Sequence, residues 1–109
     1  FEKVQTMVAK DDTVAVLGLS YKPDTYITEE SAGLFLAQHL KRNGHRVVVH
    51  DYGAKPANNP SLHEFENVED IATLQKRDDV KLAVICCPWP QYSSLAFHPN
   101  TKIFTPWKI

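Results

Sequence analysis

The segment Thr13–Leu17 is an unbroken run of β-branched and apolar residues that ends at Gly18. A strand that alternates apolar and polar residues buries one face, whereas an unbroken apolar strand is buried on both faces, as the strands of parallel sheets are. Similar runs occur at Arg46–His50, Leu82–Cys86 and Lys102–Thr105. The chain is therefore expected to fold around about four parallel strands with helices on both sides of the sheet.

The residues between the first two of these runs carry the signals of a helix. Thr28 can cap the helix start, and Glu29 and Glu30 fall in the first turn, where the helix dipole favours negative charge. Asn43 and Gly44 form a stop signal at the other end. One face carries the small and apolar residues Gly33, Leu36, Ala37 and Leu40. A strand, a helix and a second parallel strand imply a right-handed crossover, so we expect an α/β fold, a Rossmann-like open parallel sheet flanked by helices.

Three other segments have weaker helical patterns. Residues 1–10 place apolar side chains at positions 1, 4, 7 and 8, and residues 60–76 carry Val68, Ile71, Ala72 and Leu74. A short helix fits residues 91–95. We expect one domain from about Asp11 onward, because neither a repeat nor a linker interrupts the sequence. Since the chain begins with Phe1 and stops directly after a strand-like run, we also expect it to be a piece of a longer protein.

The composition of the 109 residues is that of a globular domain, with 43% hydrophobic and 23% charged side chains. The formal net charge of −1 does not supply the basic field that binding of a nucleic acid requires. No apolar run approaches the roughly 20 residues of a membrane span, and no signal peptide opens the chain. Two adjacent cysteines cannot build a disulfide framework, which indicates a reducing compartment such as the cytoplasm.

Ligands of open parallel sheets bind beyond the carboxyl ends of the strands. The residues at those ends are rich in aromatic side chains and include Lys22 and Lys108, which suits a stacked base or sugar whose phosphate charge is met by ammonium groups. Lys22 lies in the loop after the first strand, and no helical or strand pattern accounts for it, so we expect it to bind an anion. Only Gly18 is present where a dinucleotide fingerprint needs three glycines. Glu29 and Glu30 occupy the helix start that would hold a pyrophosphate, so NAD binding by this segment is not expected.

Four other groups of residues have both a structural and a functional interpretation. Asp51 ends the second strand, where a Rossmann fold keeps its ribose-binding acid, but without the glycine loop a turn aspartate is favoured. Cys86 and Cys87 have no evident base or cation beside them and are expected at a buried strand end rather than as nucleophiles. Trp89 and Trp107 fit a core cap and a binding role equally well. The histidines lack metal-ligand spacing and are expected at the surface or at helix ends: His39, His45, His50, His63 and His98.

Three segments, taken in order, resemble a known family. Residues 14–25 with Glu29–Ser31 are similar to its strand, its G-L-[AS]-[FY]-K-x-x-T motif and the helix start that follows. Arg46–Asp51 resembles its "V…YDP" strand, and Leu82–Pro90 resembles its "VVI-x-T-x-W-P-E-F" segment, with Gln91-Tyr92 in place of Glu-Phe. Together they cover nearly the whole chain, which is identified as similar to the C-terminal, UDP-binding domain of the UDP-glucose/GDP-mannose dehydrogenase family.

The resemblance implies a larger enzyme. Such enzymes have an N-terminal domain that binds NAD, a long central helix used for dimerisation, and a C-terminal domain that binds the nucleoside diphosphate of a sugar nucleotide. They oxidise the C6 hydroxyl of the sugar to a carboxylate in two NAD-dependent steps, through a catalytic cysteine upstream of this domain. Residues 1–10 would then be the tail of the upstream linking helix and residues 11–109 the nucleotide-sugar-binding domain. The full-length protein is expected to be a homo-oligomer, and no residue of this chain is expected to be catalytic.

The resemblance implies that three positions of this chain contact the nucleotide sugar. Tyr21 matches the family's aromatic residue and Lys22 its lysine, and an ammonium group near a diphosphate makes a charge-assisted contact. Lys108 stands where some members have the arginine of a D-P-W-R sequence, although lysine lacks that arginine's bidentate grip on phosphate. The family's T-D-D-x-R-E-S stretch is replaced by residues 25–31, in which Glu29 stands where the family has an arginine that reaches the dinucleotide.

Three functions fit these observations. The leading one is the nucleotide-binding domain of a sugar-nucleotide 6-dehydrogenase, with a UDP-sugar or a GDP-sugar as its ligand. The charge reversal at Glu29 and the loss of both aspartates motivate the second, a non-catalytic scaffold or assembly domain that has lost its ligand contacts. The third is a stand-alone regulatory domain similar to flavodoxin.

Overall fold

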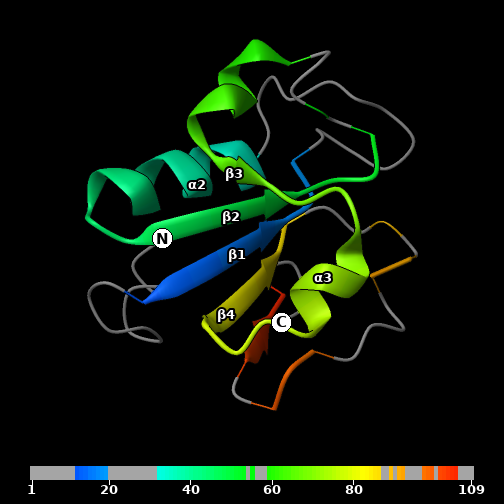
Figure 1. The fold of residues 1–109 in the computed structure, drawn as a ribbon. Coiled ribbons are helices and arrows are strands. Elements are labelled where there is room, and N and C mark those ends of the chain that lie inside the picture. The colour runs from blue at the N-terminus through cyan, green and yellow to red at the C-terminus, as the bar shows by residue number, and fades with distance from the viewer. Residues whose placement is uncertain are drawn as a thin grey trace.

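The computed structural model describes residues 12–19, 32–53, 55, 59–86, 89, 91–92, 97–99 and 101–105. In chain order the described elements are β1 (Thr13–Leu17), α2 (Ala32–Arg42), β2 (Arg46–His50), the 3-10 helix η1 (Pro60–Glu64), β3 (Glu66–Asn67), α3 (Ile71–Gln75), β4 (Val80–Ile85) and β5 (Lys102–Phe104). The strands form one sheet in the order β3-β2-β1-β4-β5, and every neighbouring pair is parallel. Figure 1 shows α2 on one face of this sheet and α3 on the other. The expected α/β, Rossmann-like fold is confirmed, with five strands in place of about four.

Alternate residues of the central strand β1 face opposite layers. Val14 and Val16 belong to a core cluster with three residues of α2, namely Leu36, Ala37 and Leu40. Ala15 and Leu17 belong to a second cluster, with Leu74 of α3 among its buried members. All five residues of β1 are buried. The unbroken apolar run therefore forms a strand covered on both faces, as its sequence predicts.

The predicted strand boundaries agree closely with the observed ones. The predictions for Thr13–Leu17 and Arg46–His50 coincide with β1 and β2, which pair in register from Thr13 with Arg46 to Leu17 with His50. Strand β4 begins at Val80, two residues before the predicted start, and ends at Ile85. Strand β5 ends one residue earlier than predicted.

Helix α2 ends in the way that its sequence predicts. The N–H of His45 donates to the carbonyl of Leu40 at 3.1 Å, and the N–H of Gly44 donates to the carbonyl of Lys41 at 3.2 Å. Gly44 has a φ of 90°, the left-handed conformation that glycine adopts without strain. These bonds make the Schellman motif, which satisfies the last carbonyl groups of the helix. The predicted helix start at Thr28–Ser31 lies outside the described residues, as do residues 1–10 and most of the predicted short helix at 91–95.

Gly33 brings the first turn of α2 against the carboxyl end of β1. A Cβ atom at this position would lie well inside the van der Waals distance of the Gly18 carbonyl oxygen and 3.3 Å from the Cβ of Cys86. Gly18 itself has a φ of 88°, and its N–H donates to the carbonyl of His50 at 2.8 Å. The helix can approach β1 and β4 this closely because Gly33 has no side chain.

The segment 60–76, which its sequence predicts to be weakly helical, is divided into three elements. The 3-10 helix η1 and the helix α3 flank the two-residue strand β3, which pairs with Val48 and Val49 of β2. The side-chain amide of Asn67 donates to the carbonyls of Leu62 and Phe65, at 2.8 and 2.9 Å, and so holds the chain between η1 and β3. Periodicity did not predict β3, because its position depends on pairing with a distant strand.

A cluster of ion pairs holds β3 close to the beginning of β4. The guanidinium of Arg77 donates from two nitrogens to the carboxylate of Asp79, at 2.9 and 2.6 Å, and from a third to Glu66 at 2.7 Å. The hydrogen bonds from Arg77 lower the pKa of Asp79, and those to Asp79 and Glu66 raise the pKa of Arg77. These ion pairs lie at the amino end of β4, opposite to the end of the strand at which Cys86 follows.

We predict that Gly33→Ala destabilises the fold. Alanine favours a helix over glycine by about 1 kcal/mol, but overpacking a rigid site costs about 1–3 kcal/mol, and here the contacted atom belongs to the main chain. The expected net loss is about 1 kcal/mol and at most about 2 kcal/mol in the free energy of unfolding, measured by urea denaturation. Gln38→Ala on the same helix is the control and is expected to change stability by less than about 0.5 kcal/mol. A Gly33→Ala variant as stable as the control would contradict the close approach.

Candidate functional site

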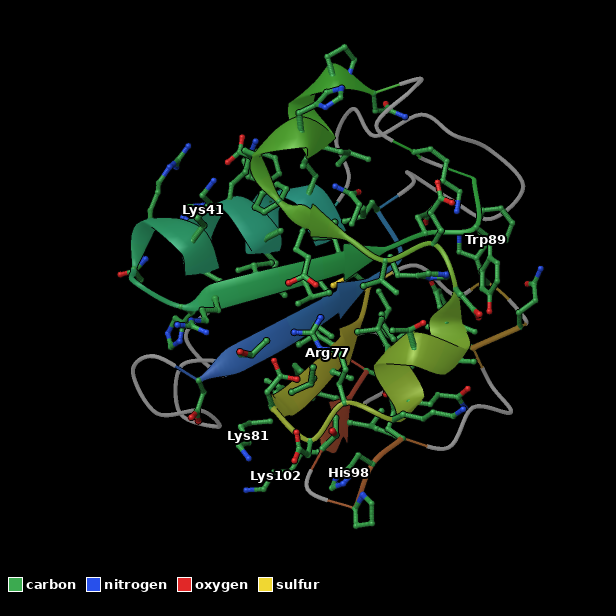
Figure 2. All side chains as sticks on the ribbon, in the orientation of Figure 1. Lys41, Arg77, Lys81, Trp89, His98 and Lys102 are labelled. Carbon is green, nitrogen blue, oxygen red and sulfur yellow. The ribbon has the colours of Figure 1, made fainter. Side chains whose placement is uncertain are left out.

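The carboxyl ends of β1, β2 and β4 lie side by side at one edge of the sheet. The register pairs Leu17 with His50 on one side and with Ile85 on the other. Figure 2 shows Trp89 on the side toward which the arrows of β1 and β2 point, away from Lys41. We call this region the carboxyl edge, and its described residues are Gly18, Leu19, His50–Gly53, Cys86, Trp89 and Tyr92. Ligands of open parallel sheets bind at this edge.

The carboxylate of Asp51 joins three segments of the carboxyl edge. Its Oδ1 accepts hydrogen bonds from the main-chain N–H of Leu19 at 2.8 Å and from the indole N–H of Trp89 at 3.0 Å. Its Oδ2 accepts from the N–H of Gly53 at 2.8 Å, the local bond of an aspartate turn. Asp51 is only 2% exposed. The prediction of a turn aspartate is confirmed, and the structure adds two long-range bonds that the sequence does not reveal.

Trp89 caps the core and is held by a polar contact. It is 7% exposed and belongs to the cluster of Ala15, Leu17 and Ile85, while its indole N–H reaches Asp51. A buried tryptophan with a satisfied N–H is a packing residue with a polar handle. The ring centroids of Tyr52 and Trp89 are 5.7 Å apart, so the aromatic side chains here contact one another. Of the two interpretations of Trp89, the structure supports the core cap, and Trp107 lies outside the described residues.

His50 is a core residue, which corrects the expectation of a surface or helix-end histidine. It ends β2, is 2% exposed, and places Nδ1 2.8 Å from the hydroxyl oxygen of Tyr92. The Tyr92 hydroxyl also reaches the carbonyl oxygen of His50 at 3.2 Å. Nε2 is buried and has no hydrogen-bond partner in the described part of the chain, whichever ring nitrogen carries the proton. In the sequence, His50 and Asp51 form a polar pair at the end of an apolar strand, which favours an exposed histidine. The burial of His50 depends instead on Tyr52 and Tyr92, which pack edge-on against its ring.

Burial is the main reason that the pKa of His50 falls from 6.5 to about 4. The positive charge of Lys55 lowers the pKa as well, because a second cation near the ring disfavours imidazolium. Asp51, Asp70 and the main chain at Glu69 act in the opposite direction. The ring is therefore neutral in the folded protein at neutral pH.

Lys55 is a positively charged residue close to the carboxyl edge, and no sequence pattern predicted its position there. Its ammonium group donates to the main-chain oxygen of Asp51 at 2.7 Å. The contact places a positive charge next to the carboxylate that links the loops. The signal that could have found it is the spacing, since Lys55 follows the strand-end acid by four residues within the same turn-rich loop.

The residues predicted to bind the nucleotide, Tyr21, Lys22 and Lys108, lie outside the described residues. Leu19, two residues before Tyr21, is described and is fixed at the carboxyl edge by Asp51. Cys86 is a thiol that follows β4, is partly buried, and donates its main-chain N–H to Leu17 at 2.7 Å. Its position fits the predicted strand end, and Cys87 lies outside the described residues.

Three further findings concern the described residues. None of their histidines, cysteines and acids form a group of three or more that could hold a metal ion. His45 lies at the end of α2, as expected of a helix-end histidine, although its side chain is buried rather than exposed. Within the described ranges, no helix has the length and apolar character that crossing a membrane requires.

We predict that the protein loses stability as the pH falls from about 6.5 to about 4. In this range the unfolded chain binds a proton at His50 that the folded chain does not, so the free energy of unfolding decreases as the pH is lowered. The difference between pKa values of 6.5 and about 4 corresponds to about 3 kcal/mol, fully present above pH 6.5. Urea denaturation at pH 4, 5, 6 and 7 measures it.

His50→Gln is the matched variant, because glutamine can accept a hydrogen bond but does not titrate. The variant is expected to be less stable than the wild type at pH 7 and to show a shallower decrease of stability between pH 6.5 and 4. Equal slopes in the two proteins would assign the acid sensitivity to other groups.

The sequence matches the UDP binding domain of the UDP-glucose/GDP-mannose dehydrogenase family over residues 15–106. The chain belongs to this family. Its residues 15–106 include the last three residues of β1, all of α2 and β2, and the whole carboxyl edge, so the family match and the described geometry concern the same part of the chain.

Relatives and solved structures extend this finding. UDP-glucose 6-dehydrogenases of Pongo abelii and Bos taurus are each 24% identical over 98 residues, which cover 80% of this chain and 20% of the relative. A UDP-glucose dehydrogenase from the hyperthermophilic archaeon Pyrobaculum islandicum has a similar structure, with a TM-score of 0.76 and 30% identity over 95% of this chain and 27% of that one. The chain thus spans about a fifth of the length of the curated relatives that it matches.

Proposed function

We propose that this chain binds the nucleotide diphosphate of a sugar nucleotide, as one domain of an NAD-dependent 6-dehydrogenase similar to UDP-glucose dehydrogenase. The observation that carries the proposal is the match of residues 15–106 to the family's UDP binding domain. In the full-length protein the reaction would oxidise the C6 hydroxyl of the sugar to a carboxylate. In this proposal, the chain binds the substrate. The catalytic cysteine is assigned to a part of the full-length protein upstream of this chain.

The chemistry of the carboxyl edge supports binding of an anion. Tyr21 and Lys22 follow Leu19, whose position at this edge is fixed, and Lys108 follows β5 by four residues. Ammonium groups bind phosphate oxygens through charge-assisted hydrogen bonds, and an aromatic ring can stack on a base or sugar. We assign the substrate contacts to Tyr21, Lys22 and Lys108. UDP is the favoured nucleotide, because the matched family domain and the matched relatives are named for it.

The described residues do not fit NAD in the Rossmann manner. The acid at the end of β2, which would accept the ribose hydroxyls, is Asp51, and both of its oxygens accept hydrogen bonds from the protein. At 2% exposure, Asp51 could reach a ribose only by breaking those bonds. We therefore assign NAD binding to the remainder of the full-length protein. We further propose that the full-length protein is a homo-oligomer and that it functions in a reducing compartment such as the cytoplasm.

We predict that the chain binds UDP and that Lys22→Ala and Lys108→Ala each weaken this binding by about tenfold, because a hydrogen bond to a charged group contributes roughly 1.5–3 kcal/mol. Isothermal titration calorimetry with UDP, UDP-glucose and GDP-mannose measures the dissociation constants. A smaller effect of Lys108→Ala than of Lys22→Ala is expected if lysine replaces the family's arginine only in part.

Lys81→Ala is the matched control, since Lys81 belongs to β4 and lies away from Trp89 in Figure 2. It is expected to bind UDP as the wild type does. Unchanged binding by Lys22→Ala would refute the site assignment. Absence of binding with every nucleotide, together with an unchanged melting temperature, would refute the proposed function and favour the scaffold domain instead.

A further inference from the structure

We infer that Asp51 is a positioning residue for the nucleotide site, because its buried carboxylate fixes the start of the segment that carries Tyr21 and Lys22. The inference rests on the proposed function, in which those two residues contact the nucleotide. It assigns to Asp51 a role other than direct contact with the ligand: the acid holds the loop from which the contacts are made.

Among the described residues, the carboxylate receives N–H groups from three different parts of the chain. Leu19 follows β1, Gly53 follows β2, and Trp89 follows β4. Each of these segments leaves the sheet at the carboxyl edge, so one buried group sets their relative positions. A hydrogen bond to a charged acceptor is shorter and stronger than a neutral one, which makes such a link stiff.

The hydrogen bond from Leu19 to Asp51 lies only two residues before Tyr21 in the sequence, so it can affect the position of the nucleotide contacts. Two peptide units separate Leu19 from Tyr21, a reach of about 7 Å at most, and Lys22 is one residue further. The position of Leu19 therefore limits where the main chain of the two proposed contact residues can lie. The preceding residue is also restrained, since Gly18 donates to His50 and its carbonyl faces Gly33 of α2.

An aspartate is needed at this position because all three partners are donors. The two oxygens of a carboxylate accept all three bonds, whereas asparagine offers one oxygen and turns an NH₂ group toward at least one N–H. Asp51→Asn thus removes the negative charge and at least one of the three bonds, with almost no change in side-chain volume.

The experiment compares Asp51→Asn with two controls in the 109-residue chain. Asp79→Asn makes the same chemical change at an exposed acid at the amino end of β4, where Arg77 is its partner. Val80→Ala destabilises the core at a residue that is 1% exposed and lies at the same end of that strand, without contact to Asp51. The measurements are UDP affinity by calorimetry and the ¹H–¹⁵N resonances of the Leu19 amide and the Trp89 indole.

For Asp51→Asn, below its melting temperature, we expect both resonances to move and the dissociation constant for UDP to rise about tenfold, because the main chain at Leu19, no longer held as firmly, must be ordered when UDP binds. Asp79→Asn and Val80→Ala are expected to keep the wild-type affinity, although Val80→Ala lowers the melting temperature. A purely structural role of Asp51 would lower the melting temperature in the same way and leave UDP affinity unchanged, which would overturn the inference.

A second variant covers the case in which Asp51→Asn does not fold. Trp89→Phe keeps an aromatic ring in the core and removes only the indole N–H, so Oδ1 loses one of its two donors. It is expected to move the Leu19 resonance and to weaken UDP binding severalfold, and an unchanged affinity would overturn the inference. Failure of the wild type to bind UDP would instead refute the proposed function, with the Leu19 and Trp89 resonances still reporting whether Asp51 holds them.

Discussion

The hydrogen bonds to the carboxylate of Asp51 are the interaction on which the carboxyl edge depends. A buried charge without partners would be strongly destabilising, so the three N–H groups that reach Asp51 are required for the fold as well as for the site. The same bonds occupy both oxygens of the acid at the end of β2, the position from which a dinucleotide-binding Rossmann fold contacts the ribose.

The layers on each side of the sheet determine what the carboxyl edge contains. On the α2 side, the contact between Gly33 and Gly18 brings the beginning of the helix against the end of β1. On the α3 side, Trp89 and Tyr92 cover the sheet. Tyr52 and Tyr92 pack against His50, whose neutral ring follows from its burial. The packing on both faces of the sheet thus fixes the main chain at Gly18 and Leu19, two residues before Tyr21.

Much of the fold could be predicted from the sequence, because its strands are buried on both faces and their apolar runs are unbroken. β1 and β2 were predicted to the residue, and the end of α2 followed from Asn43 and Gly44. Strand β3 could not be predicted, since two residues, Glu66 and Asn67, carry no periodicity and are placed by pairing with β2. The burial of His50 and the bonds of Asp51 depend on residues about 40 positions away, beyond any local pattern.

The central claim, that the carboxyl edge binds a nucleoside diphosphate, is tested most directly by a ¹H–¹⁵N NMR titration of the chain with UDP. The account predicts that the resonances of Leu19, Gly53 and the Trp89 indole shift together as UDP is added, while those of Arg46 and Val80, at the amino ends of β2 and β4, stay in place. Shifts confined to the amino ends of the strands, or no shift at millimolar UDP, would contradict it.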